Sequence, residues 1–407
     1  MSLTTRVLIA LAAGLAIGTA IAAMQLPADR IVAGAELVGE LWLDALRMTI
    51  IPLVVALLIT GTAAAASTAA LGGVAGRAVA WFAVLLVAAA IFSALVTPLL
   101  LAWSPIDPAD AAALRAGAAP ATAIPAPVPL TAWLKTVIPS NPIAAAAEGA
   151  MLPLVIFTVF FGLAVTRIAA EPQERVVGFF QGVADTMLVV VRWVLWAAPL
   201  GVFALALVVG SRVGIAAAGA LVHYVIVISA VCILLTAAIY VLVLVMGIPA
   251  ARFARAAVPA QAVGISTQSS LAALPAMIES AQQNLGIPPR IAGLVLPLAV
   301  SVFRITSPAA NFALVLYVAS LYGIEPTLPQ LLSGMALAVV LSLAVVSLPS
   351  AITFFTATVP ISAAMGVPIE VLPLLLAVEM LPDIWRTVGN VTADLALTAI
   401  VAKRADG

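Results

Sequence analysis

The sequence predicts an all-α polytopic membrane protein, with eight transmembrane helices plus two re-entrant helical hairpins. Of its 407 residues, 65% are hydrophobic and 8% are charged, and the mean hydropathy is +1.26. A soluble protein carries about 25% charged residues, so a soluble globule is excluded. The apolar residues also form runs long enough to cross a hydrocarbon core about 30 Å thick, which takes roughly 20 helical residues.

Eight apolar stretches are predicted to span the membrane. They cover residues 8–24, 41–58, 79–102, 151–165, 187–209, 215–246, 291–321 and 371–401. The first is predicted to be a retained helix, because no convincing cleavage pattern follows it and the second begins soon after. Residues 103–129, rich in alanine and proline, are predicted to form an extracellular loop without chemistry of its own.

The distribution of basic residues predicts that both termini are cytoplasmic. If the N-terminus is inside and the spans alternate, nine basic residues lie inside and four outside, which satisfies the positive-inside bias. The inside set is Arg6, Arg77, Arg167, Arg175, Arg252, Arg255, Arg290, Lys403 and Arg404, and the outside set is Arg30, Arg115, Lys135 and Arg212. We therefore expect a multi-pass protein of the inner (plasma) membrane.

Two segments, residues 258–277 and 341–367, are apolar but interrupted by serine, threonine and proline. Each precedes a long helix that carries a charge inside the membrane. Irregular backbone is tolerated at membrane depth only where it is buried in protein or lines a wet cavity. A broken segment followed by a helix, occurring twice, is typical of a transporter site built from inverted repeats, so two re-entrant hairpins are predicted. The alternative is two ordinary proline-kinked spans.

The last span carries a polar stripe on one helical face. Its members are Glu379, Asp383, Arg386, Thr387, Asn390 and Asp394. At 100° per residue they fall within an arc of about 100°. One charge at the centre of a bilayer costs about 2.5 kcal/mol or more, so these residues are expected to face a protein interior or cavity and to mark a functional site. The alternative is a purely structural network that joins Asp383 to Arg386 and Arg386 to Asn390. With three carboxylates and one arginine, the charges of such a network would not balance.

The predicted site combines groups suited to a ligand that has both an acid and an amine. Arg386 presents a planar fork that can hold a carboxylate through two hydrogen bonds, and Asp383, one turn away, is placed to receive an ammonium group. Ser269 and Ser270, with backbone amides of the first broken segment, would hold a second carboxylate. These features indicate an acidic amino acid as the substrate.

The charge balance indicates that a cation accompanies this ligand. Arg304 adds a second arginine, so the buried set contains three carboxylates and two arginines, a residual of minus one. An anionic substrate would make the cavity more negative, so something cationic travels with it or is already bound.

Other classes of protein are excluded on composition and spacing. A net charge of zero provides no basic surface for nucleic acid, and one cysteine, Cys232, with one histidine, His223, permits neither a disulfide nor a zinc site, so no metal or cofactor is predicted. Asp383 and Asp394 are about 16 Å apart along one helix, too far for an aspartyl protease dyad, so no enzyme is expected. An anion channel, which would need a continuous polar lining from several helices, is kept as the alternative of another class.

The closing stretch DIWRTVGNVTADLALTAIVAK resembles the D-x-x-R-T-x-x-N-V-T-x-D ending of the eighth helix in the dicarboxylate/amino acid:cation symporters, the glutamate and aspartate transporter family. STQSSLAALP resembles the serine-rich tip of the family's first hairpin. LRMTIIPLVVALLITG, SNPIAAAAEGAMLPLVIF and RWVLWAAPLGVFAL resemble parts of its second, fourth and fifth helices. The resemblance covers nearly the whole chain.

The resemblance implies roles for individual residues and a domain organisation. Arg386 would hold the side-chain carboxylate of the substrate and Asp383 its amine, and further contacts would come from Thr387, Asn390 and Ser270. The family also implies a homotrimer working as an elevator, in which a fixed scaffold supports a moving transport domain. The implied scaffold is residues 1–70 (helices 1–2) and 130–214 (helices 4–5); the transport domain is residues 71–102 (helix 3) and 215–407 (helix 6, hairpin 1, helix 7, hairpin 2 and helix 8).

The family's sodium-binding positions are altered in this chain. The family's N-M-D-G-T on the seventh helix is here FRITS, residues 303–307, so the asparagine and aspartate that ligate sodium have become Phe303 and Ile305. On the third helix, the tyrosine, threonine and serine that complete a sodium site correspond to Phe82, Leu85 and Leu86. A hard cation such as sodium needs oxygen ligands, and these side chains have none.

The remaining features resemble the sodium-independent, proton-coupled branch of the family. Arg304 occupies the methionine position and can supply permanently the charge that sodium brings elsewhere. Asn390 and Asp394 survive from another sodium site, which keeps a sodium-coupled aspartate or dicarboxylate symporter as the alternative. A buried carboxylate would carry the proton; Glu379 is preferred, because Asp394 is expected to pair with Arg304. The second hairpin, SLPSAITF, lacks the family's glycines, so its lid is expected to move less freely.

Overall fold

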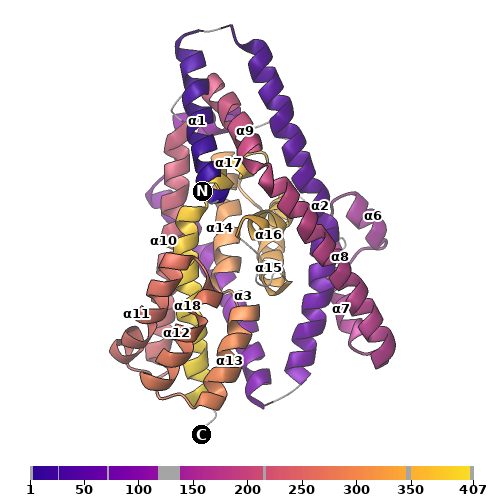
Figure 1. Ribbon diagram of the computed structural model, residues 1–407, viewed down its shortest axis with the longest axis vertical. Coiled ribbons are helices and arrows are strands. Elements are labelled where there is room, and N and C mark those ends of the chain that lie inside the picture. Colours follow the sequence, from indigo (N-terminus) through magenta and orange to yellow (C-terminus); the bar gives the residue numbers. More distant parts are fainter. Residues whose placement is uncertain are drawn as a thin grey trace.

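The computed structural model describes residues 3–25, 27–70, 73–117, 138–213, 217–344 and 350–403. Seventeen helices form in this part of the chain, and Figure 1 shows them as one elongated bundle. The N-terminal half contains α1 Leu3–Ala23, α2 Asp29–Ala70, α3 Gly73–Trp103, α4 Pro108–Gly117, α6 Pro142–Ala147, α7 Met151–Val165, α8 Ala170–Trp196 and α9 Ala198–Val213. The C-terminal half contains α10 Ala217–Val245, α11 Ala250–Thr267, α12 Ser270–Gln283, α13 Pro289–Val302, α14 Thr306–Leu321, α15 Leu328–Ala344, α16 Ser350–Met365, α17 Leu372–Val378 and α18 Met380–Lys403.

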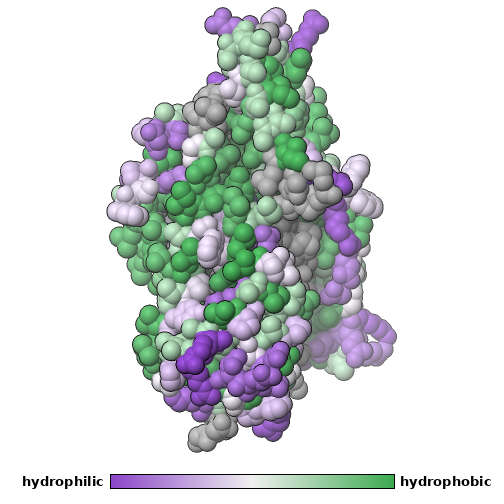
Figure 2. Space-filling model, turned by 60° about the vertical axis from the view of Figure 1, so that its left-hand side comes forward, coloured by the Kyte–Doolittle hydropathy of each residue, from purple (hydrophilic) through white to green (hydrophobic). Residues whose placement is uncertain are grey.

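The outer surface of the bundle is suited to lipid. Within the described residues, four stretches are long and apolar enough to cross a membrane by length and composition: Gly76–Trp103, Ala170–Trp196, Ala218–Val245 and Pro289–Leu321. Large apolar side chains remain exposed on these helices, among them Leu99 at 68% and Trp196 at 77%. Figure 2 shows hydrophobic residues over much of the visible face. Such a surface is stable only under hydrocarbon, so the chain is a multi-pass membrane protein.

Two helices form the centre of the bundle. In α14, every residue from Thr306 to Ala319 is buried, and in α18 burial is continuous from Arg386 to Ala402. α18 packs against α3, α10, α11, α12, α13 and α14, and in Figure 1 it runs beside α10 in the lower half of the molecule. The polar residues of α18 therefore face protein rather than lipid, as the cost of charge in a bilayer requires.

The first broken segment turns between two packed helices. α11 ends at Thr267 and α12 begins at Ser270, with Gln268 in the left-handed backbone region at φ +52°. The Ser269 side chain accepts a hydrogen bond from the Ala272 amide at 3.2 Å, which caps α12. The chain thus breaks here, as predicted, instead of continuing as one kinked span. In the second broken segment α15 packs against α16, and the glycine-poor connection at 345–349 lies outside the described residues.

Two predicted spans are in fact interrupted helices. The span 291–321 is divided into α13 and α14, with Phe303 in an extended conformation at φ −104° and ψ 107°. The span 371–401 is divided into α17 and α18, which meet at Glu379. Neither break contains a glycine, and the spacing of the apolar residues alone does not reveal either break. Both breaks lie next to charged residues.

The connection predicted at 103–129 contains a short helix that the sequence analysis did not predict. Residues Pro108–Gly117 form α4, which packs against α9 and α10. The Asp107 carboxylate accepts a hydrogen bond from the Ala109 amide at 2.8 Å, and Pro108 occupies the first turn, where its missing amide hydrogen costs nothing. Ala113 and Leu114 are fully buried. Residues 118–137 lie outside the described part of the chain.

Candidate functional site

A small cavity lies where three interrupted segments meet. Its lining comes from the turn between α11 and α12, the break between α13 and α14, and the start of α18. The residues are Gln268, Arg304, Thr306, Ser307, Glu379, Asp383, Arg386, Thr387 and Asn390. Its free volume is about 20 Å³, room for about one water molecule, so an amino acid needs these segments to move before it fits.

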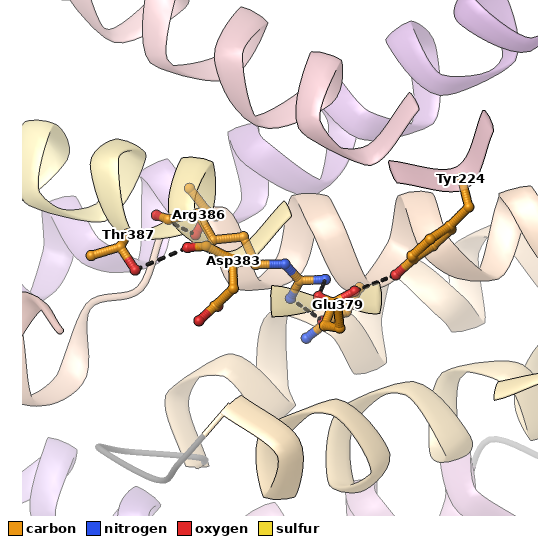
Figure 3. A network of polar contacts seen from close by, with 7 residues as sticks. Tyr224, Glu379, Asp383, Arg386 and Thr387 are labelled. Carbon is orange, nitrogen blue, oxygen red and sulfur yellow. Dashed lines mark hydrogen bonds and ion pairs between the residues drawn. The ribbon is translucent and has the colours of Figure 1, made fainter. Parts of the chain in front are cut away.

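Arg386 is held by two buried side chains. Its Nη2 atom lies 2.7 Å from Glu379 Oε1, and its Nη1 atom donates a hydrogen bond to Asn311 Oδ1 at 2.8 Å. The Tyr224 hydroxyl, on α10, donates to Glu379 Oε2 (Figure 3). Arg386, Glu379 and Tyr224 are 7%, 4% and 0% exposed. The ion pair neutralises both buried charges, and loss of one partner would leave the other uncompensated.

Asp383 and Thr387 border the same cavity from one face of α18. The Thr387 hydroxyl donates to the Asp383 carbonyl at 3.0 Å. In Figure 3 the Asp383 side chain extends away from the Glu379–Arg386 pair. Asp383 and Arg386 therefore offer an anionic and a cationic group in different directions, as a ligand with separate amine and acid groups requires.

Asn390 connects α18 to the break between α13 and α14. Its Oδ1 atom accepts the Thr306 amide hydrogen at 3.0 Å and lies 2.9 Å from the Thr306 hydroxyl. The same hydroxyl is 3.1 Å from the Arg386 carbonyl. Asn390 thus satisfies the first amide of α14 and fixes the break against α18.

Arg304 projects from that break and lines the cavity. Asp394 is fully buried, and its two carboxylate oxygens have no hydrogen-bond partner among the described residues. The expected pairing of Arg304 with Asp394 does not appear as an ion pair in the described part of the chain.

The two serines at the first hairpin do not line the cavity. The Ser269 hydroxyl is engaged as the cap of α12, Ser270 is buried, and Gln268 occupies the lining instead, 3.4 Å from the Met380 carbonyl through Nε2. Sequence reasoning also missed Tyr224 and Asn311. Each is a polar side chain in an otherwise apolar stretch, which is a signal that could have found them.

Phe82 of α3 and Phe303 at the end of α13, which the sequence resemblance aligns with sodium-binding positions of the family, meet in the structure. The rings of Phe82 and Phe303 stack with centroids 4.9 Å apart and planes inclined by 12°. Both side chains are buried, as are Leu86 and Ile305. Among the described residues no group of three or more His, Cys, Asp or Glu side chains could hold a metal ion.

The chain matches the Sodium:dicarboxylate symporter family over residues 3–404. It belongs to this family. The symporter family contains transporters, not enzymes, so the chain is a cation-coupled symporter of amino acids or dicarboxylates. The family membership that the sequence motifs indicated is confirmed.

Relatives of this symporter differ in coupling ion and substrate. A proton/sodium-glutamate symport protein of Geobacillus stearothermophilus is 27% identical over 410 residues, 97% of this chain and 93% of its own length. A proton/glutamate-aspartate symporter of Escherichia coli (strain K12) is 25% identical over 374 residues, 90% of this chain and 84% of its own length. The neutral amino acid transporter B(0) of Homo sapiens is 29% identical over 431 residues, 95% of this chain and 77% of its own length. The coupling ion and the substrate of this symporter must therefore be inferred from its own residues.

Proposed function

We propose that this symporter carries acidic amino acids, glutamate or aspartate, together with protons and independently of sodium. The observation that carries the proposal is the buried Arg386 guanidinium, held inside a cavity by an internal carboxylate, Glu379. A substrate carboxylate would take the place of Glu379, and the planar guanidinium fork suits that exchange.

The substrate assignment combines this geometry with the family resemblance. Arg386 would hold the side-chain carboxylate and Asp383 the amine, with Thr387 and Asn390 as further contacts, all of which line the cavity. Ser269 and Ser270 lie outside the present lining. Their proposed role therefore requires the hairpin turn to shift, and Gln268 is the residue that now closes this side.

Proton coupling follows from competition for Arg386. Ionised Glu379 pairs with Arg386, whereas protonated Glu379 leaves the guanidinium available to the substrate without leaving a buried charge unpaired. The groups that act on Glu379 are Arg386 and Asp383 on α18 and Tyr224 on α10. Binding of an acidic substrate would therefore take up a proton, and the proton would travel with it. Asp394 is the second candidate carrier.

Sodium independence is supported by the packing at the altered positions. The Phe82–Phe303 stack fills with carbon the place where the family positions sodium ligands, and a hard cation gains nothing from such a lining. Arg304 supplies a fixed positive charge in the same region. One observation favours a sodium-coupled alternative: the Asp394 oxygens, near Asn390, have no hydrogen-bond partner in the described residues and would suit a cation.

For the architecture we propose the family's elevator homotrimer, with eight transmembrane helices, two re-entrant hairpins and both termini cytoplasmic. The scaffold is residues 1–70 and 130–214, and the transport domain is residues 71–102 and 215–407. α4 belongs to the connection at 103–129 and packs on both α9 and α10, that is, on both proposed domains.

The proposal is tested with purified protein in liposomes. An inward proton gradient in sodium-free buffer is expected to drive accumulation of labelled aspartate or glutamate, and a sodium gradient at equal pH is expected to drive none. Strict dependence on sodium would contradict the coupling assignment and favour the alternative at Asp394. Saturable counterflow of labelled against unlabelled substrate is expected, and its absence would indicate a channel.

A further inference from the structure

A second cavity, separate from the proposed substrate site, lies at the end of the molecule that holds the C-terminal end of α18 (Figure 1). Its volume is about 250 Å³, and it is an open pocket bounded by the turn from α10 to α11, the turn from α12 to α13, and the last residues of α18. Arg252 and Lys403 contribute the charged side chains of the lining, and no acidic residue of the described chain lines it. Both charges are positive, so the cavity favours an anion.

Backbone contacts hold the two cations in place. The Lys403 ammonium donates to the carbonyls of Met246 at 3.0 Å and Gly247 at 3.1 Å, and Arg252 Nε donates to the Asn284 carbonyl at 2.8 Å. These bonds use two of the three ammonium hydrogens and one guanidinium hydrogen. The Nη groups of Arg252 and the third ammonium hydrogen can bind a further acceptor.

Two glycines allow the cations to approach this closely. Gly247 and Gly286 have φ values of +74° and +72°, which favour glycine. A Cβ atom on Gly247 would lie 2.7 Å from Lys403 Nζ, and one on Gly286 would lie 3.3 Å from Arg252 Nη2. Both turns therefore present bare backbone beneath a cation, and the positions of the two charges are set by the fold.

The cavity borders the lipid-facing surface. Val241, Leu244 and Val245 at the end of α10 are 60%, 57% and 73% exposed, and Gly247 follows two residues later. Figure 2 shows the corresponding change, with hydrophilic residues gathered toward the lower end of the molecule below a hydrophobic zone. An anion bound here would thus lie beside apolar side chains that can contact acyl tails.

We propose that this cavity binds the phosphate group of an anionic phospholipid from the cytoplasmic leaflet. A paired arginine and lysine suit a phosphate, and basic pockets between transmembrane helices at this level are suited to lipid head groups. A soluble phosphate has the same anionic chemistry but no acyl tail to contact the exposed end of α10. This inference depends on membrane insertion with the proposed cytoplasmic C-terminus, and not on the proposed substrate or coupling ion.

The experiment measures lipid retention by native mass spectrometry of the purified protein, titrated with phosphatidylglycerol or phosphatidylcholine. Wild type is expected to retain phosphatidylglycerol in preference. Arg252→Gln and Lys403→Gln are each expected to weaken its binding about fivefold, and the double variant about 25-fold, since each basic residue contributes about 1 kcal/mol at an anionic surface. The matched control is Arg255→Gln, an exposed arginine on the same helix that does not line the cavity, with an expected change below twofold.

Three results would overturn the proposal: equal retention of both lipids by wild type, unchanged retention in the double variant, or an equal loss in Arg255→Gln. Inorganic phosphate that binds as tightly as phosphatidylglycerol would assign the cavity to a soluble anion and overturn the lipid assignment. Lys403 also holds the turn that follows α10, so the double variant requires a monodisperse elution profile and an unchanged melting temperature. If the double variant does not fold, the Arg252→Gln variant alone tests the proposal, because this substitution leaves both Lys403 contacts intact.

Discussion

The Glu379–Arg386 pair and the Phe82–Phe303 stack are two buried regions with opposite chemistry. The first concentrates charge and satisfies it with an ion pair and hydrogen bonds to Asn311 and Tyr224. The second holds no side-chain oxygen and is stabilised by ring packing. They meet at the break between α13 and α14, where Phe303 packs into one region and its neighbour Arg304 lines the cavity of the other.

The difference shows how a carrier can use one set of residues to pack its interior and another set to couple the substrate to an ion. Neither a stacked aromatic pair nor a permanently charged arginine can leave the protein together with the substrate. These groups therefore contribute to the structure that exists before the substrate binds. An ionisable carboxylate paired with Arg386 can change its charge, and the substrate can compete with it. Each of the following variants changes one of the two regions and is compared with a matched residue elsewhere.

Phe82→Ala is expected to produce the largest loss of stability. Removing a buried ring costs about 3–5 kcal/mol, because the transfer energy is lost and a cavity remains beside Phe303. The measurement is the free energy of unfolding, or the melting temperature, in detergent. The control is Phe179→Ala on α8, where the side chain is 65% exposed and its loss removes little packing. Equal effects of the two variants would show that the stack does not support the fold.

Arg386→Ala is expected to weaken binding of aspartate or glutamate by at least about 30-fold, because truncation of one partner of a buried charge pair costs about 2–5 kcal/mol. Binding of a neutral amino acid is expected to persist. Arg212→Ala is the matched control: its ion pair with Glu36 has the same 2.7 Å separation, but the side chains are 37% and 30% exposed, and an exposed pair contributes about 0–1 kcal/mol. Unchanged aspartate affinity in Arg386→Ala, measured by calorimetry, would remove this residue from the substrate site.

Glu379→Gln is expected to abolish the pH dependence of acidic substrate affinity. In wild type, affinity falls as pH rises, since ionised Glu379 competes for Arg386. The glutamine resembles the protonated form, so affinity at high pH is expected to equal that at low pH. Affinity titrated against pH in sodium-free buffer provides the measurement, with Asp394→Asn in parallel. If pH dependence disappears in Asp394→Asn and survives in Glu379→Gln, Asp394 carries the proton.

Tyr224→Phe is expected to have the smallest effect on the charged region. It removes one hydrogen bond to ionised Glu379, and such a bond contributes about 1.5–3 kcal/mol. Ionised Glu379 then competes less well for Arg386, so substrate affinity at high pH should rise by roughly tenfold, with little change at low pH. Tyr317→Phe is the control, because its hydroxyl donates to the Ala220 carbonyl at 2.6 Å and not to Glu379. A rise in both variants would indicate a general loosening of α10.

The sequence by itself determined the class of protein and most members of the site. Composition and long apolar runs require a membrane-spanning helical bundle, and the helical period places Asp383, Arg386, Thr387 and Asn390 on one face, where the structure has them lining a cavity. α4 was missed because its alanine and proline composition is shared with irregular segments, and only the Asp107 cap and the burial of Leu114 distinguish it.

The tertiary structure decided which of these residues act on one another. Arg386 forms an ion pair with Glu379 across the junction of α17 and α18. Asn311, from α14, bonds Arg386, and Tyr224, from α10, bonds Glu379. Phe82 meets Phe303 from a distant part of the chain, and Arg304 turns inward at a break that its apolar neighbours conceal. Local sequence sets the faces of a helix through its period, but contacts between distant helices depend on how all of them pack, and a periodic pattern contains no record of that packing.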